Sequence, residues 1–240
     1  MVYYVYAYTK LLANGEIKDG EKINVVVPTG NFGNILAAYY AKNLGVPIAK
    51  LICASNDNKV LYDFFQTGTY DKNREFVLTT SPSMDILISS NLERLIYLIC
   101  GEDSEKTKEL MEELKTTGKY TITPEMKEKL ADFDAGYSTE EETAESIHDT
   151  YQKTGYVMDT HTAVAAHVCG QYRSKSGDQA KCVIASIASP YKFVKSVMSA
   201  IDAENANADE FDLLPKLQEV SGVPMPQAIK DILDAKVLHD

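Results

Sequence analysis

A short apolar run that leads through a glycine- and asparagine-rich turn into a helical pattern restricts this chain more than any other feature. Residues 25–40 read VVVPTGNFGNILAAYY. The run from Ile23 to Val27 has the pattern of a strand covered on both faces. From Asn31 to Leu44, apolar residues recur at helical spacing, and Gly45 marks the end of that helix. A buried strand followed at once by a helix is the repeating unit of a parallel sheet.

The same alternation recurs along the rest of the chain. Clusters of Gly, Pro, Asn and Ser separate short apolar runs from segments with helical periodicity. We therefore expect a single α/β domain over residues 1–240, an open and mostly parallel sheet flanked by helices. Further strands are expected at 48–54, 76–79 and 182–186, and further helices at 59–65, 84–100 (capped by Ser83), 163–172, 189–201, 211–220 and 227–233.

Residues 101–150 differ in composition from their surroundings. They hold fifteen Asp and Glu residues against six Lys and no Arg. Thr123-Pro124 and the STEEE sequence at 138–142 are start signals for helices. We interpret this segment as an acidic helical insertion whose charge keeps a solvent-facing surface soluble.

Net charge and composition exclude several classes of partner. The formal charge of −11 repels nucleic acid and anionic membranes. No apolar run approaches the ~20 residues that span a bilayer, and no signal peptide is recognised before the first helical segment. The four cysteines are scattered without metal-ligand spacing, which is typical of reduced thiols in a cytoplasmic protein.

The turn at residues 30–34, Gly-Asn-Phe-Gly-Asn, has the chemistry of an anion cradle. The N-terminus of a helix presents unpaired backbone N–H groups and partial positive charge. Gly30 and Gly33 can adopt positive φ and admit a ligand close to the backbone, while Asn31 and Asn34 add side-chain donors. These neutral donors suit the phosphate of an organic cofactor.

Other phosphate loops fit this turn less well. A P-loop needs Gly-Lys-Ser/Thr, and this turn has no lysine. The Rossmann fingerprint needs G-x-G-x-x-G, and an RNA-binding GxxG loop needs basic surroundings. A tight strand–helix turn that binds nothing also fits the pattern and stays open.

Histidines offer no shared metal site. His161 and His167 are six residues apart, about 240° around a helix, so they cannot hold one ion from the same face. We predict no metal. His161 lies close to Asp159 in sequence, and a packed, capped residue fits this pattern better than a catalytic one.

Four sequence blocks, taken together, resemble a known family. They read VVPTGNFGNILA, KLICASNDNKVLYDFF, TTSPSMDILISSNLERL and ASPYKF. In this order they resemble threonine synthases of the bacterial and fungal type, which are pyridoxal-phosphate enzymes of fold type II (tryptophan-synthase-β-like). The resemblance implies that the cofactor phosphate is bound by Gly30, Asn31, Phe32, Gly33 and Asn34. It also implies a lyase that converts O-phospho-L-homoserine and water to L-threonine and phosphate.

The block at 81–94 is the family's hallmark near the substrate. The resemblance therefore places Ser83, Asp85, Asn91 and Arg94 in substrate binding. Ser83 and Asp85 could equally cap a helix. Arg94 could form a surface ion pair or clamp a phosphate.

Departures from the family pattern limit what this chain can do. The family's Schiff-base lysine lies in a Phe-Lys-Asp block, and no lysine here has that context. Lys192, in Ser-Pro-Tyr-Lys-Phe, matches a different family lysine. Where this chain has Ile187, the family commonly has a Thr whose hydroxyl faces the pyridine nitrogen. Where this chain has Thr160, the family commonly has Pro, but Thr160 can still cap a helix.

We therefore expect a C-terminal portion that lacks the family's N-terminal half. The Tyr-rich first helix is apolar on all sides, and it resembles a helix from the interior of the family's chain. We therefore expect Met1 to be the start of an open reading frame that does not coincide with a natural domain boundary. We assign no catalytic residue and expect the isolated chain to be inactive. The alternatives are a non-catalytic or split phosphate-ligand-binding homologue, and another fold-type-II enzyme.

Overall fold

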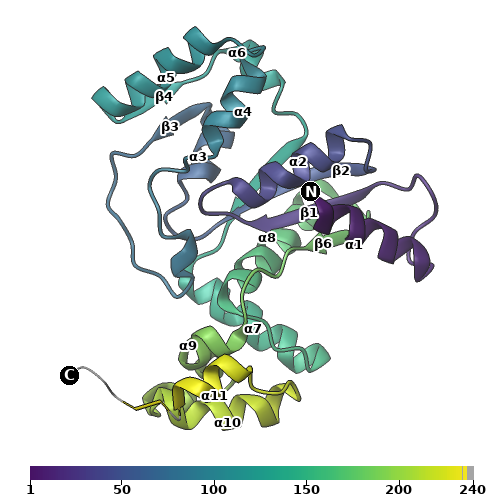
Figure 1. The fold of residues 1–240 in the computed structure, drawn as a ribbon, viewed down its shortest axis with the longest axis vertical. Helices are drawn as coiled ribbons and strands as arrows, with labels where there is room; N and C mark the ends of the chain where they lie inside the picture. The colour runs from purple at the N-terminus through teal and green to yellow at the C-terminus, as the bar shows by residue number, and fades with distance from the viewer. Residues whose placement is uncertain (234, 237–240) are drawn as a thin grey trace.

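The computed structural model describes residues 1–233 and 235–236. A sheet of four parallel strands forms its centre, in the order β5-β2-β1-β6 (Figure 1). The mostly parallel α/β sheet predicted from the alternation is therefore present. Its strands are β1 (Ile23–Pro28), β2 (Ile48–Ser55), β5 (Phe133–Tyr137) and β6 (Cys182–Ile184).

Helices cover both faces of this sheet, which explains why β1 and β2 lack polar alternation. Val25 and Val27 lie in one core cluster together with residues of α2 (Gly33–Asn43) and α3 (Val60–Thr67). Val26 faces the opposite way and packs in a second cluster with α8 (Thr160–Ser176), which contacts all four strands.

A second small layer lies beyond one edge of the sheet, at the top of Figure 1. Its centre is the antiparallel pair β3–β4, in which the rings of Tyr70 and Tyr120 stack with centroids 5.5 Å apart. The layer is built from β3 (Thr69–Asp71), α4 (Leu92–Ile99), α5 (Ser104–Thr117), β4 (Lys119–Thr121) and α6 (Pro124–Glu128).

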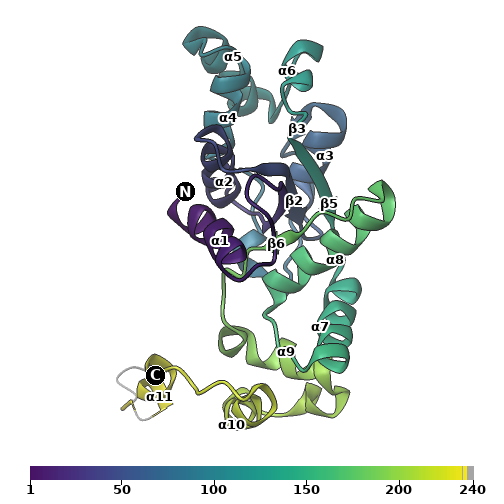
Figure 2. The ribbon, with the colours of Figure 1, turned by 90° about the vertical axis from the view of Figure 1, so that its right-hand side faces the viewer.

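A helical layer lies on the opposite side of the sheet, at the bottom of Figures 1 and 2. Its core cluster joins residues of α7, α9 and α10. Thr139 starts α7 with a capping box closed by Glu142, and Pro124 follows the N-cap Thr123 of α6, as the sequence predicted. The elements of this layer are α7 (Glu140–Thr154), η2 (Pro190–Phe193), α9 (Val194–Ile201), η3 (Ala203–Asn207), α10 (Glu210–Ser221) and α11 (Gln227–Leu233).

The acidic segment 101–150 is helical as expected, but it also carries strands. Its helices are α5, α6 and α7. Strand β4 pairs with β3, and β5 forms an edge of the central sheet beside β2. The high density of charge concealed the short apolar pattern of β5.

The first helix, α1 (Val2–Ala13), is buried on one side only. Tyr4 and Tyr8 are 6% exposed, whereas Tyr3 is 84% exposed and Tyr6 is 59% exposed. The expectation of burial on all sides is not met within this structure.

Two predicted elements are wrong. Residues 76–79 form no strand, because Asn58 takes the place of a neighbouring strand: its Oδ1 accepts from the Val77 N–H (3.0 Å) and its Nδ2 donates to the Val77 carbonyl (2.8 Å). The helix predicted from Met84 begins only at Leu92, after η1 (Pro82–Met84) and an irregular stretch. Ser83 therefore caps no helix at 84–100.

Candidate functional site

The candidate site lies where the carboxyl ends of β1 and β6 meet. These two strands are parallel neighbours, so the turn after β1 and the residues after β6 emerge side by side. Helix α2 covers one face of the sheet and α8 the other (Figure 2). Ligands of open α/β sheets bind at the carboxyl ends of strands where the chain changes from one face to the other.

Six consecutive backbone N–H groups, from Gly30 to Ile35, donate to no acceptor within the described part of the chain. The first amide of α2 with a partner is that of Leu36, which donates to the Phe32 carbonyl at 3.1 Å. Ile35 is 0% exposed and Phe32 is 1% exposed, so two of these donors belong to fully buried residues. Because buried N–H groups are nearly always paired, this cradle fits an anionic ligand.

The backbone of the turn differs from the prediction in one respect. Neither Gly30 nor Gly33 has positive φ; the left-handed residue is Phe32, with φ 61°. Gly30 is needed for a different reason, because a Cβ atom there would lie 2.5 Å from the carbonyl oxygen of Ser83. The Phe32 ring packs in the core against Phe65 and Phe133, so this residue offers the cradle only its backbone.

Residues 89–91 occupy the acceptors of the turn. Ser89 Oγ donates to the Gly30 carbonyl at 2.5 Å, and the Ser90 N–H donates to Asn31 Oδ1 at 2.6 Å. Asn91 Nδ2 donates to the Asn31 carbonyl at 2.9 Å. The turn is thus held through its oxygens, which leaves its amides available. Ser89 and Ser90 were not among the predicted site residues, although they directly precede the predicted Asn91.

Asn34 joins the cradle to a cavity of about 520 Å³. Its Oδ1 accepts a hydrogen bond of 2.8 Å from the hydroxyl of Tyr4 in α1. Burial raises the pKa of Tyr4, so this hydroxyl remains a donor. The volume suits a small organic ligand. The cavity is lined by Tyr3, Tyr4, Ala7, Asn34, Val183, Ala185, Ser186 and Ile187.

Asp85, predicted to bind substrate, holds the segment around it in place. Its Oδ1 accepts from Asn56 Nδ2 (2.7 Å) and Asn58 Nδ2 (3.0 Å), and also from the Thr79 hydroxyl (2.7 Å). Its Oδ2 accepts from the Thr79 N–H at 2.9 Å. Both carboxylate oxygens therefore have protein partners.

The other three predicted substrate residues lie close to the turn or to its neighbouring segment. Asn91 bonds the turn directly, and Arg94 Nη1 donates to Asn91 Oδ1. Ser83 has an exposed side chain, and its backbone touches the space beside Gly30. These positions leave the side chains of Ser83 and Arg94 accessible.

His161 is a buried link between two elements of the site. The Ser83 N–H donates to its Nε2 at 3.2 Å, so Nε2 carries no proton and Nδ1 does. Nδ1 lies 3.2 Å from Asp159 Oδ1. His161 is therefore a neutral, packed residue, as the pattern favoured. Asp159, and not Thr160, caps α8.

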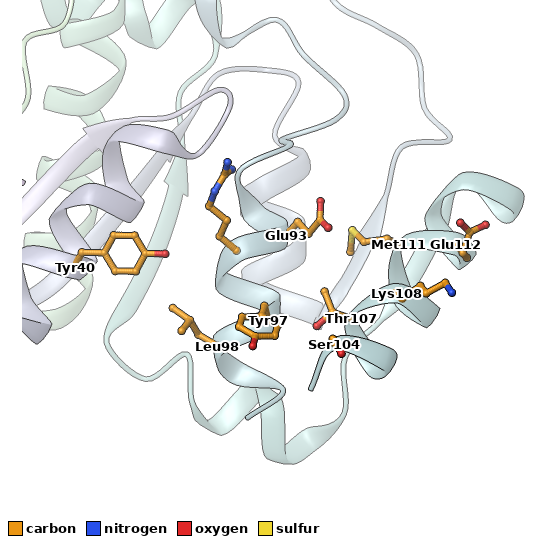
Figure 3. A pocket seen from close by; sticks show the side chains of 10 residues that line it. Tyr40, Glu93, Tyr97, Leu98, Ser104, Thr107, Lys108, Met111 and Glu112 are labelled. Atoms are coloured by element: carbon orange, nitrogen blue, oxygen red, sulfur yellow. The ribbon is translucent and has the colours of Figure 1, made fainter. Parts of the chain in front are cut away.

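A larger groove lies elsewhere, between α4 and α5 (Figure 3). Its volume is about 760 Å³, and its wall includes Tyr40, Tyr97, Lys108 and Met111. Arg94 reaches it, but none of the unpaired amides does. Anion binding depends more on hydrogen-bond donors than on the volume of a cavity, so we place the candidate site at the turn.

Comparisons with known proteins point to one family. No protein-family model matches the chain. Threonine synthase-like 1 of Pongo abelii is 42% identical over 226 residues, which are 93% of this chain and 30% of that protein. A PLP-bound threonine synthase from Brucella melitensis superposes with a TM-score of 0.79 and 36% identity, covering 98% of this chain and 45% of the other. Threonine synthase from yeast gives a TM-score of 0.83 and 33% identity, covering 98% of this chain and 46% of the other.

These findings confirm the resemblance to threonine synthases and the α/β fold that it implied. The chain spans less than half the length of each of these three proteins, which is consistent with a C-terminal half. Within residues 1–233 and 235–236, no helix is long and apolar enough to cross a bilayer, and no cluster of His, Cys, Asp or Glu could hold a metal ion.

Proposed function

We propose that this chain is the cofactor-binding part of a threonine synthase and holds the phosphate of pyridoxal phosphate on the amides of residues 30–35. The unpaired N–H groups from Gly30 to Ile35 carry this proposal. An anion with several acceptor oxygens satisfies them together. The cavity that begins at Asn34 has room for the pyridine ring.

In this proposal, the side chains around the turn hold its hydrogen-bond donors in place. The Phe32 ring fixes the turn to the core, and the bonds from residues 89–91 fix its oxygens. Tyr4 fixes Asn34 at the mouth of the cavity. The donors are thus held before the ligand arrives, which lowers the entropic cost of binding. Bound pyridoxal phosphate would supply an electron sink for carbanion chemistry.

The full reaction we propose converts O-phospho-L-homoserine and water to L-threonine and phosphate. Ser83, Asn91 and Arg94 lie beside the cradle and would orient the substrate, whose phosphate suits the fork of a guanidinium group. The cofactor-anchoring lysine of the family has no counterpart here, so a missing N-terminal half would supply it. We accordingly propose that this chain alone turns over no substrate. We also propose that the complete enzyme is cytoplasmic, because the four cysteines are free thiols.

A charge placed in the cradle tests the proposal. Asn34→Asp keeps the acceptor for Tyr4 but adds a negative charge where the anion would bind. At about 5 Å and an effective dielectric constant of about 20, that repulsion is roughly 3 kcal/mol. We expect the affinity for inorganic phosphate and for pyridoxal phosphate, measured by calorimetry, to fall at least about tenfold.

Asn43→Asp is the matched control. Asn43 is exposed at the other end of α2, roughly 14 Å from Asn34 at the ordinary helical rise. It should leave both affinities unchanged. A negative charge at a helix N-terminus also stabilises by about 0.3–1 kcal/mol, so Asn34→Asp should bind less while melting no lower. Wild-type protein that binds neither ligand, or an Asn34→Asp variant that binds both normally, would refute the proposal.

One observation favours a second candidate, a non-catalytic phosphate-ligand-binding homologue. Ile187 is 43% exposed and lines the cavity at the position where the family commonly has Thr. Co-expression with the N-terminal half of a related threonine synthase separates the two. Release of phosphate from O-phospho-L-homoserine favours the enzyme, and cofactor binding without turnover favours the homologue.

A further inference from the structure

Helix α3 begins without a hydrogen-bonding cap. Its N-cap residue is Lys59, whose side chain has no oxygen that could accept from a backbone N–H. The N–H groups of Val60 and Leu61 donate to no acceptor within the described part of the chain. Val60 is 4% exposed and Leu61 is 3% exposed, so bulk solvent does not reach these donors either. Two buried N–H groups therefore need an acceptor.

The polar side chains that directly precede α3 are engaged elsewhere. Asn56 Oδ1 accepts from the Asn58 N–H at 3.1 Å, and Asn58 Oδ1 accepts from the Val77 N–H at 3.0 Å. Asp57 Oδ2 accepts from the Glu140 N–H at 3.2 Å. These three side chains therefore leave the first amides of α3 without a cap.

Ser55, the last residue of β2, carries a buried hydroxyl with the same need. Ser55 is 4% exposed, and its Oγ is the only buried side-chain polar atom of residues 1–233 and 235–236 without a hydrogen-bond partner. Cys53 is its neighbour on the same face of the strand. Burial raises the pKa of the Cys53 thiol to about 12, more than the hydroxyls of Thr29 and Ser55 lower it, so the thiol stays protonated and its sulfur is a weak acceptor. An unpaired buried hydroxyl costs free energy, so Ser55 also calls for a ligand.

A small cavity joins these groups. Its volume is about 10 Å³, and Ser55, Val60 and Leu61 line it. Thr29 and Gly30, at the start of the cradle turn, also belong to its wall. One water molecule needs about 10–15 Å³ and two to four polar partners. The Ser55 hydroxyl and the two amides supply three such partners.

Charge favours water over an ion in this cavity. The only cationic side chain in its described wall is Lys59, whose Nζ lies over the Tyr137 ring, 4.4 Å from the centroid. An anion would therefore be buried without a paired charge, which is costly. A cation would face N–H groups and the positive end of the helix dipole. A neutral molecule that both accepts and donates hydrogen bonds fits these surroundings.

We infer that this cavity is a binding site for one water molecule, which accepts from the amides of Val60 and Leu61 and donates to Ser55 Oγ. The two amides occupy both lone pairs of the water, so its proton goes to Ser55. The water acts as the cap of α3 and joins this helix to the end of β2, next to the cradle turn. The site does not depend on the binding of pyridoxal phosphate.

Substitution of Ser55 distinguishes a hydrated cavity from a dry one by the sign of its effect. With water bound, Ser55→Ala removes a hydrogen bond and should raise the equilibrium constant for unfolding about fivefold, measured by urea unfolding. In a dry cavity the same change would remove an unpaired buried hydroxyl, and the protein would be equally stable or more stable. Such a result would refute the inference.

Ser138→Ala is the matched control. Ser138 is 1% exposed, and its Oγ lies 3.0 Å from Thr143 Oγ1, so its hydroxyl has a partner within the protein. Its loss should raise the unfolding constant whether or not the cavity near Ser55 is hydrated. The control therefore measures what one buried serine hydrogen bond contributes in this protein.

A crystal structure of the protein grown in sodium bromide identifies the occupant. We expect one density peak at about 2.7–3.2 Å from Ser55 Oγ and from the nitrogens of Val60 and Leu61, without anomalous signal at the bromine edge. An anomalous peak would show that the site takes a halide, and a cavity without density would show that it is dry. Either result would overturn the assignment of water. Failure of the protein to bind pyridoxal phosphate would refute the proposed function and leave this site unaffected.

Discussion

The carbonyl oxygen of Ser83 lies 2.5 Å from the place where a Cβ atom would stand on residue 30. The Cα atom of Met84 is 3.2 Å from the same point. The cradle turn and the segment that starts the predicted substrate block therefore touch through their backbones. Glycine is required at position 30 by this contact between two chain segments, and a positive φ plays no part.

Gly30→Ala should destabilise the protein by about 1–3 kcal/mol, because a backbone atom must move to admit the methyl group. The control is Gly170→Ala in α8, where a Cβ atom would meet nothing within 4 Å. Alanine is the better helix former there and should stabilise by about 0.5–1 kcal/mol. Urea unfolding measures both changes. Equal effects of the two substitutions would contradict this account of Gly30.

Phe32 combines a left-handed backbone with a buried ring, and two substitutions separate these features. Phe32→Ala loses the packing against Phe65 and Phe133 and should cost about 3–5 kcal/mol. Phe32→Gly loses the same ring but relieves backbone strain of roughly 1–2 kcal/mol. We expect the glycine variant to be the more stable of the two in chemical denaturation, the reverse of the usual order. An alanine variant more stable than the glycine variant would refute strain at this position.

Much of the central sheet could be predicted because its strands carry their burial in their own sequence. The mostly apolar sequences of β1 and β2 indicate buried strands without any information about distant residues. Gly45 and Gly68 likewise mark helix ends through a local property, their positive φ. The cradle could be placed as well, since a strand, a turn and a helix N-terminus are adjacent in the chain.

The wrong predictions share a physical cause, which is hydrogen bonding between distant segments. Val77 looks like part of a strand, yet the Asn58 side chain takes its backbone partners. The stretch before Leu92 has helical periodicity, yet Ser89 and Ser90 bond the turn at Gly30 and Asn31. Local propensity cannot report partners that lie tens of residues away.

Asp159 should make stability depend on pH in a defined window. The pKa of Asp159 is lowered in the folded protein, because the effect of burial, which raises it, is outweighed by hydrogen bonds from His161 and Thr162. An aspartate in an unfolded chain has a pKa of about 3.9. Its contribution is therefore complete above about pH 4 and is lost as the pH falls through the folded pKa. The difference in unfolding free energy between wild type and Asp159→Asn should be constant from about pH 5 to 7 and should shrink below about pH 4. Urea unfolding at several pH values measures it, and a difference that grows in acid would contradict the lowered pKa.

A substitution of Asp85 distinguishes a structural role of this residue from a substrate-binding role. Its oxygens accept from Asn56, Asn58 and Thr79, and an asparagine cannot accept all of these bonds, because its amide would face a donor. Asp85→Asn should therefore cost about 1–3 kcal/mol in urea unfolding. Asp19→Asn, which removes the same charge at an exposed turn, should cost almost nothing. If Asp85→Asn instead unfolds like wild type and only weakens binding of O-phospho-L-homoserine to the complete enzyme, Asp85 contacts the substrate directly.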